Sequence, residues 1–223
     1  MHNFWTYKLP KELEVLLSSQ LIMKPVSTAC IETTMLNELT GCITIDHEIL
    51  NNISCGMLQW WHRYFCYQQI ETADGLRIPA FHLWHPQDHG NVLISQHSLS
   101  GELGLVRGAH ARFIEKIGNA SFASNQVKIV QNHQHGITVD YYENNVRSSR
   151  VIEQYFDTTK GLQYRSLLYS KNMGNVTSNG NHIISTLQKD QLNNWVKHKI
   201  EEVGNLDVIL PPIYRLESKK YFA

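Results

Sequence analysis

The sequence predicts an α+β fold in which a curved antiparallel sheet wraps around one long C-terminal helix. Two observations lead to this class. Short strand patterns separated by turn residues dominate residues 76–169, and a single long helical pattern begins near Ser185. Many antiparallel strands followed by one helix favour packing of the sheet's apolar face on that helix. We expect a main domain at residues 51–223, with residues 1–50 as an N-terminal appendage packed on it.

The strands of the predicted sheet are short and closely spaced. Turn signals at residues 133–136 and 158–161 suit hairpins, which implies antiparallel neighbours. Residues 42–45 form the best strand candidate in the N-terminal part. The other predicted strands cover residues 76–84, 91–96, 106–117, 127–131, 136–142, 147–156 and 162–169.

A helix rich in aromatic residues is predicted after Ser54, a residue type that caps helix N-termini. Plain core packing is one interpretation of its aromatic face, and one wall of a pocket for a flat apolar ligand is another. A third is an exposed Trp60/Trp61 patch that meets a partner protein. For the pocket, we predict ligand contacts from Trp60 and Tyr64, together with Phe81 further along the chain.

The C-terminal helix has clear signals at both ends. Ser185 and Gln188 have the spacing of a capping box. Apolar residues then recur at helical intervals as far as Val203. Gly204 and Asn205 are predicted to end the helix, because the prolines at 211 and 212 that follow should prevent its continuation.

Two polar residues of this helix, His198 and Glu202, lie four positions apart. This spacing places an imidazole and a carboxylate on one helix face, close enough to bind one divalent ion from the same side. An exposed His–Glu pair is the alternative interpretation.

Glu115 is a second candidate metal ligand. Two-residue alternation along its strand puts Glu115 on the same face as Ala109, Ala111 and Phe113. A carboxylate directed into a core is costly unless a cation or hydrogen-bond donors meet it. Glu115 therefore binds a metal, reaches solvent at the strand end, or pairs with a cation such as Arg165.

Composition excludes several classes of function. Lys and Arg number 20, as do Asp and Glu, so no basic field favours nucleic acid or an anionic membrane. No apolar run reaches the roughly 18 residues of a membrane span. The four cysteines lack CxxC spacing and no signal peptide precedes them, which predicts reduced thiols in the cytoplasm. No GxSxG motif indicates a serine hydrolase.

Three segments resemble the signatures of a known family. They are residues 57–62 (MLQWWH), residues 83–89 (LWHPQDH), and the run from His198 to Leu206 with Leu210, Pro211 and Tyr214 after it. Together they are similar to the diacetylphloroglucinol hydrolase family, with phloretin hydrolase, of which this chain would be a divergent member. The resemblance covers residues 57–214. It implies a helix-grip fold, as in START-like lipid-binding proteins, and zinc-dependent removal of an acyl group from a phenolic ring.

Within this resemblance His89 matches the zinc-binding histidine. Two imidazoles and two carboxylates then make up the predicted metal site: His89, Glu115, His198 and Glu202. These donors suit zinc and would also accept manganese, iron or nickel, so zinc is expected by analogy. His85 is the rival ligand and a candidate catalytic residue, although Pro86 restricts its backbone and favours a supporting role. Asp88 is expected to orient His89 or to cap the turn.

Two positions depart from the family pattern and alter the expected pocket. Phe81 stands where the resemblance implies a tyrosine that binds a ring hydroxyl. Glu153 stands where it implies a substrate-contacting histidine. Alternation puts Glu153 on a strand face with Val151 and Tyr155, so this carboxylate also points into the core and is a candidate catalytic residue.

The expected function is therefore zinc-dependent hydrolysis of the C–C bond between an acyl group and a phenolic or β-diketone-like carbon. A small apolar or phenolic ketone is the expected partner, and a homodimer is left open. One alternative is a metal-dependent cyclase or lyase acting on a polyketide-like substrate. Another is a non-catalytic carrier of apolar ligands, which would have apolar residues at the four ligand positions.

Overall fold

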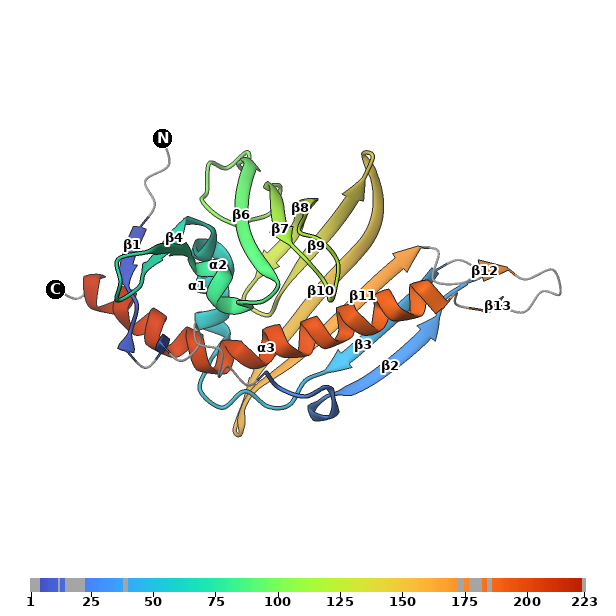
Figure 1. The fold of residues 1–223 in the computed structure, drawn as a ribbon, viewed down its shortest axis with the longest axis horizontal. Helices are drawn as coiled ribbons and strands as arrows, with labels where there is room; N and C mark the ends of the chain where they lie inside the picture. Colours follow the sequence, from blue (N-terminus) through green and yellow to red (C-terminus); the bar gives the residue numbers. More distant parts are fainter. Residues whose placement is uncertain are drawn as a thin grey trace.

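A computed structural model of the chain describes residues 5–11, 13–14, 23–37, 40–171, 175–176, 182–183 and 186–221. It confirms the predicted α+β class. A curved antiparallel sheet of eight strands, in the order β2-β3-β11-β10-β9-β8-β7-β6, wraps around the long C-terminal helix α3 (Figure 1). This arrangement is the helix-grip fold. The predicted capping box at Ser185 and Gln188, and most of the 172–182 segment before it, lie outside the residues whose side chains are described.

Hairpins connect most neighbouring strands of the large sheet, as the turn signals at 133–136 and 158–161 predict. Register shifts accompany its strong curvature in β6, β8 and β10. The strands are β2 (Cys30–Met35), β3 (Thr40–Asp46), β6 (His89–Gln96), β7 (His110–Glu115), β8 (Ala123–His133), β9 (Gly136–Glu143), β10 (Val146–Thr158) and β11 (Gly161–Lys171).

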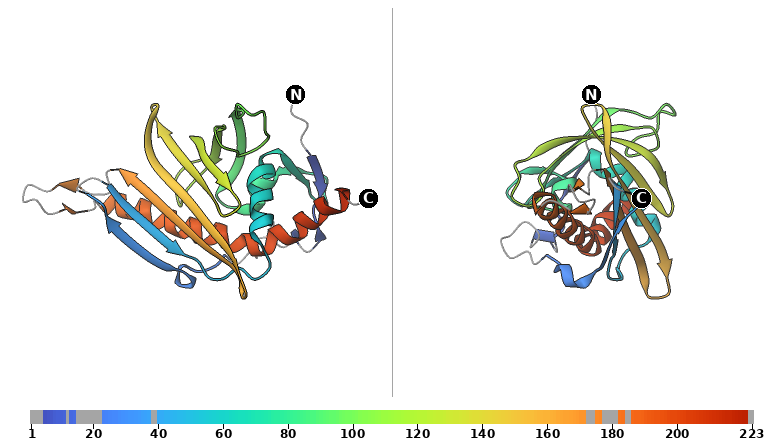
Figure 2. Two further views of the ribbon diagram at one scale, coloured as in Figure 1. Left: turned by 180° about the vertical axis from the view of Figure 1, so that it is seen from behind. Right: turned by 90° about the vertical axis from the view of Figure 1, so that its right-hand side faces the viewer.

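A second group of elements packs at the end of the molecule that holds the C-terminal part of α3 (Figure 2). It contains the small sheet β1-β4-β5, in which β1 and β4 are parallel. Ser54 caps α1 by accepting a hydrogen bond from the Met57 N–H, as predicted. The bounds of this group are β1 (Trp5–Lys8), α1 (Cys55–Tyr64), β4 (Gln68–Glu71), β5 (Arg77–Pro79) and α2 (Ala80–Trp84), with the 3₁₀ turn η3 (Phe65–Tyr67). Another 3₁₀ turn, η2 (Val26–Thr28), precedes β2. A short strand pair, β12 (Asn175–Val176) and β13 (His182–Ile183), lies at the opposite end of the molecule (Figure 1).

The predicted boundary at residue 50 is wrong, because it cuts through the large sheet. β2 and β3 precede residue 50 and pair with each other, and β3 pairs with β11. Ile43 and Ile45 of β3 are buried in one cluster with Val196 and Ile200 of α3. Residues 30–46 therefore belong to the helix-grip unit. Within this unit β3, near the start of the strand-forming region, pairs with β11 at its end, and local sequence patterns do not reveal such a distant pairing.

The predicted end of the C-terminal helix is also wrong. Helix α3 (Thr186–Tyr221) continues for 36 residues through Pro211 and Pro212. Pro211 cannot donate a hydrogen bond to the carbonyl of Asp207, and Pro212 cannot donate one to the carbonyl of Val208. Asp207 is partly exposed and Val208 is exposed, so water can bind both carbonyl groups instead. The apolar stripe continues past the prolines and its burial outweighs their cost: Val203, Leu206, Ile209, Leu210 and Ile213 are all at most 1% exposed.

Gly204 has a packing role in this helix and does not end it. A Cβ atom at this position would lie 2.7 Å from Cγ of Lys24, in the segment that crosses α3. The glycine therefore allows that segment to approach the helix closely.

Residues 76–84 do not form one extended strand. Only Arg77–Pro79 is a strand, and Ala80–Trp84 forms the short helix α2. A strand would bury alternate residues, whereas the helix buries Ala80, Phe81, Leu83 and Trp84 together. Burial of four apolar side chains within five residues explains why this segment is helical. The helix leads directly into the turn that precedes His89.

Gly104 should be far more sensitive to substitution than Gly75. Both have positive φ, +90° and +83°, but a Cβ at Gly104 would overlap the backbone carbonyl of Arg63, whereas Gly75 faces open space. Gly75→Ala is expected to cost about 1 kcal/mol of unfolding free energy, from its backbone conformation alone. Gly104→Ala is expected to cost roughly 3 kcal/mol or more. Urea denaturation measures both, and equal losses would contradict the described turn.

Candidate metal centre

Strand pairing brings His89 and Glu115 together. His89 begins β6, Glu115 ends β7, and the two are direct partners across this antiparallel pair. Side chains at such positions start about 5 Å apart on the same face. Both are buried, at 1% and 6% exposed. As predicted, Glu115 shares the core-facing side of β7 with Ala111 and Phe113.

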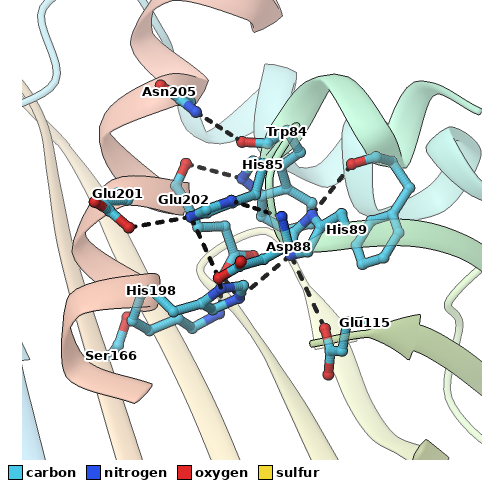
Figure 3. A network of polar contacts seen from close by, with 12 residues as sticks. Trp84, His85, Asp88, His89, Glu115, Ser166, His198, Glu201, Glu202 and Asn205 are labelled. Atoms are coloured by element: carbon cyan, nitrogen blue, oxygen red, sulfur yellow. Dashed lines mark hydrogen bonds and ion pairs between the residues drawn. The ribbon is translucent and has the colours of Figure 1, made fainter. Parts of the chain in front are cut away.

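His198 and Glu202 approach the same point from α3, as their four-residue spacing predicts. Both are 4% exposed. Nε2 of His198 lies 3.3 Å from Nε2 of His89 and 3.7 Å from Oε2 of Glu202. Nε2 of His89 lies 3.9 Å from Oε2 of Glu115. Figure 3 shows the imidazole of His198 and the carboxylate of Glu115 turned towards His89.

These separations suit one tetrahedral ion. Zinc–ligand bonds of about 2.0–2.2 Å put neighbouring ligand atoms roughly 3.3–3.6 Å apart. One donor atom from each of His89, Glu115 and His198 lies within 4.8 Å of the others. Glu202 is not part of this group, and its Oε2 also lies 2.9 Å from Nζ of Lys199.

Hydrogen bonds at Nδ1 of His89 and of His198 fix the orientation and the tautomer of both imidazoles. Nδ1–H of His89 donates to the carbonyl of Phe81 at 3.1 Å, and Nδ1–H of His198 donates to Oδ2 of Asp88 at 2.8 Å. In neutral rings both Nε2 atoms then carry a lone pair, and these lone pairs face each other. Such a contact is repulsive unless a cation lies between the two atoms. The site therefore fits a metal ion.

A proton can serve as that cation when no metal is bound. Burial lowers the pKa of His89 well below its ordinary value, so this ring is neutral. Burial also acts against charge on His198, but its hydrogen bond to Asp88 and the carboxylates of Glu202 and Glu115 outweigh burial and raise its pKa. A proton and a metal ion therefore compete for Nε2 of His198, and metal binding should weaken as pH falls.

The buried side chains around the site include more acidic groups than basic ones. Three carboxylates, Glu115, Glu153 and Glu202, lie beside one ammonium group, Lys199. Nζ of Lys199 is 2.8 Å from Oε1 of Glu153. Burial raises the pKa of both Glu115 and Glu153, partly offset by neighbouring cations. A divalent ion would remove this surplus of negative charge.

His85, Asp88 and His198 form a second close group, which we assign to support of the first. Nδ1 of His85 accepts a hydrogen bond from the Asp88 N–H at 3.2 Å, so the neutral ring carries its proton on Nε2 and points it at Glu201, 3.3 Å away. A protonated nitrogen cannot bind a metal. The expectation that Asp88 orients His89 is wrong, because its carboxylate holds His198 instead, in a carboxylate–histidine arrangement common behind metal ligands.

Two further contacts fasten the turn that carries His89 to helix α3 (Figure 3). The indole N–H of Trp84 donates to the carbonyl of Glu202 at 3.0 Å, and the Asn205 amide donates to the carbonyl of Trp84 at 3.0 Å. The sequence suggested Asn205 as part of a helix stop. In the structure it fixes the distance between the two segments that supply the ligands.

A mostly apolar cavity lies beside the candidate centre. Its volume is about 50 Å³, which is room for a few water molecules. Glu115, His198 and Glu202 form one polar region of its wall, with Glu153 and Lys199. Aromatic and aliphatic side chains complete the wall, namely Phe65, Phe81, Trp84, Leu105, Phe113, Ile117, Ile137, Val139, Tyr141, Val151 and Trp195, together with His62.

Of the three predicted ligand contacts, the structure places only Phe81 in the cavity wall. Phe81 lines the cavity and stacks on His89 with ring centres 3.8 Å apart. Trp60 and Tyr64 do not line it, because they lie on another face of α1, where Trp60 packs against Tyr214. The stripe of α1 that faces the core carries other residues, Leu58, Trp61 and His62, and Phe65 follows it in η3. Trp61 is 0% exposed, which rules out the alternative interpretation of an exposed Trp60/Trp61 patch.

Sequence reasoning missed Lys199 and His62. Lys199 lies within the run from His198 to Leu206, and His62 is the last residue of the MLQWWH segment, but no local pattern singles out either. The available signal for Lys199 was Glu153: a carboxylate predicted on a core-facing strand needs a buried cation, and Arg165, the cation we considered for Glu115, binds Asp46 instead.

Two buried histidines should make the protein acid-sensitive. Burial, with the nearby charge of Lys199, lowers the pKa of His47 and of His62 to about 3. The unfolded chain, with pKa values near 6.5, therefore binds more protons, and unfolding free energy falls as pH drops from about 6.5. We expect a loss of roughly 2 kcal/mol for each histidine by pH 4.5.

Urea denaturation at pH 7.5 and 4.5 measures this loss, and His62→Leu should reduce the difference between the two pH values. An unchanged difference would contradict the assignment of His62 as a buried neutral ring.

Comparisons with known proteins establish no family. No protein-family model matches the chain, and no curated protein matches it. Its structure is similar to that of protein Ms6760 from Mycobacterium smegmatis, with a TM-score of 0.47 and 10% identity over 82% of this chain and 98% of that one. For Ara h 8.0201 the TM-score is 0.44, with 9% identity over 74% and 99%. For SA2116, a protein of unknown function from Staphylococcus aureus, it is 0.39, with 10% identity over 86% and 98%. At these values we take nothing about function from the similarities.

Two other expectations concern the chain as a whole. The four cysteines are free thiols, and all except Cys30 are buried. Among the described helices, none combines the length and apolarity that crossing a membrane requires.

Proposed function

We propose that this protein is a zinc-dependent hydrolase that cleaves the C–C bond between an acyl group and a phenolic or β-diketone-like carbon. One observation carries the proposal: the lone-pair nitrogens of His89 and His198 face each other beside Glu115, at the polar region of an apolar cavity. The resemblance of residues 57–214 to diacetylphloroglucinol hydrolases supports the reaction class.

The proposed reaction consumes one water molecule. The acyl–ring C–C bond breaks, the acyl carbon gains the hydroxyl group and leaves as a carboxylic acid, and the ring carbon gains the proton. A divalent ion held by His89, Glu115, His198 and Glu202 would polarise the ketone and lower the pKa of water.

Glu153 is the residue we assign to holding the proton that the ring carbon receives. Burial raises its pKa, although the charge of Lys199 acts in the opposite direction. A carboxyl group with a raised pKa takes up a proton more readily than an exposed one does. Lys199 lies 2.8 Å from Glu153 and 2.9 Å from Glu202 and so holds both carboxylates in place. His85 does not line the cavity, and we assign it a positioning role through Asp88 and Glu201.

The walls must move before an aromatic ring can bind, because the cavity volume is only about 50 Å³. Trp195 and Tyr141 line the cavity and are partly exposed. We assign the opening to these two side chains, since the other aromatic side chains of the wall are all buried: Phe65, Phe81, Trp84 and Phe113.

Acetate release from 2,4,6-trihydroxyacetophenone tests the proposal. Zinc-loaded protein should release acetate, a chelator should abolish release, and zinc should restore it. Glu153→Gln should retain zinc while losing turnover by about 100-fold or more. Zinc-replete protein that releases no acetate from this or other acylated polyphenols would overturn the hydrolase proposal, and a cyclase or a carrier would then be the better assignment.

A further inference from the structure

His62 is a buried polar side chain of the cavity wall that the proposed chemistry does not use. It comes from α1, which supplies no metal ligand, and it is 2% exposed. Among the described residues, its Nδ1 has no hydrogen-bonding partner. A buried ring nitrogen left without a partner costs free energy that the fold would avoid with an apolar residue of similar size.

The ring of His62 is held in position by its neighbours. Its centre lies 5.9 Å from the ring of Trp84 and 6.0 Å from that of Tyr155. Its low pKa keeps the imidazole neutral, so it offers one donor and one acceptor nitrogen. A neutral, fixed group of this kind suits recognition of an uncharged oxygen.

We propose that His62 recognises the ligand, by a hydrogen bond between its Nδ1 and a ring hydroxyl of the molecule in the cavity. His62 would thereby select ring-oxygenated aromatic ketones over analogues that lack that oxygen. The ketone class rests on the proposed function, whereas the hydrogen bond does not depend on a metal.

Two probes that differ by one hydroxyl group test this role. They are 2,4,6-trihydroxyacetophenone and 2,6-dihydroxyacetophenone, with binding measured by calorimetry in zinc and again in EDTA. Wild-type protein should bind the trihydroxy probe about five- to tenfold more tightly, the worth of one hydrogen bond. His62→Leu should bring this ratio to about one. His62→Asn places an amide near the position of Nδ1 and should restore part of the ratio.

The ratio separates recognition from folding and from catalysis, because it compares two ligands on the same variant. An equal ratio in wild type and His62→Leu, or a wild-type ratio of one, would overturn the role of His62. So would failure of wild type to bind either probe, or a crystal structure of the probe complex with an internal water only at Nδ1. Absence of zinc or of acetate release with the ratio intact would remove the hydrolase proposal and leave His62 as the recognition residue of a carrier.

Discussion

Replacing His198 with alanine is expected to weaken zinc binding at least about 100-fold. Structural zinc sites bind with roughly 10–16 kcal/mol shared among four ligands, so the loss of one ligand removes about 3 kcal/mol. His198 also stands at the centre of the site, within 3.7 Å of both His89 and Glu202. Competition with a coloured zinc chelator measures the change.

Two further variants make the zinc experiment specific. His110→Ala removes a partly exposed imidazole from the opposite face of β7 and should leave the affinity unchanged. Asp88→Asn weakens the hydrogen bond that orients His198 and should reduce affinity by about 10–100-fold. Equal zinc affinity in wild type and His198→Ala would count against the site.

Lys199→Met is expected to destabilise the metal-free protein by about 3–5 kcal/mol. The substitution leaves Glu153 and Glu202 buried without their shared cation, and loss of one partner of a buried ion pair costs this much. Addition of Glu153→Gln should recover part of the loss, because one of the two unpaired charges disappears.

Lys197→Met is the matched control for Lys199→Met. Its side chain is 62% exposed and pairs with Glu201 at 3.8 Å, so the expected cost is at most about 1 kcal/mol. Urea denaturation in EDTA compares the variants. Similar losses at 197 and 199 would show that the charge cluster around Lys199 contributes little.

The fold class could be predicted from sequence because its signals are local. Alternation placed Glu115 and Glu153 on core-facing strand sides, hairpin turns gave the antiparallel order, and the 198–202 spacing gave one helix face. Errors arose where tertiary packing overrode a local rule. Helix α3 continues past two prolines because its apolar stripe, which includes Ile209 and Ile213, is buried. Residues 80–84 form α2 instead of the expected strand because a helix buries their apolar side chains together.

The candidate ligands could be named from sequence, but their supporting contacts could not. Asp88 holds His198, which lies 110 residues away in the chain, and Lys199 joins carboxylates from β10 and from its own helix. Such contacts depend on how separate elements pack. The rotation of α1 is another example, since it turns His62 towards the cavity and Trp60 away from it.

The central claim is that residues distant in sequence share one metal ion. A crystal of zinc-loaded protein, with anomalous scattering recorded at the zinc edge, tests it most directly. We predict a single strong peak about 2.0–2.2 Å from Nε2 of His89, Nε2 of His198 and an oxygen of Glu115, with Glu202 completing the set. A peak beside His85 and Asp88 instead, or no peak in crystals grown with saturating zinc, would contradict the claim.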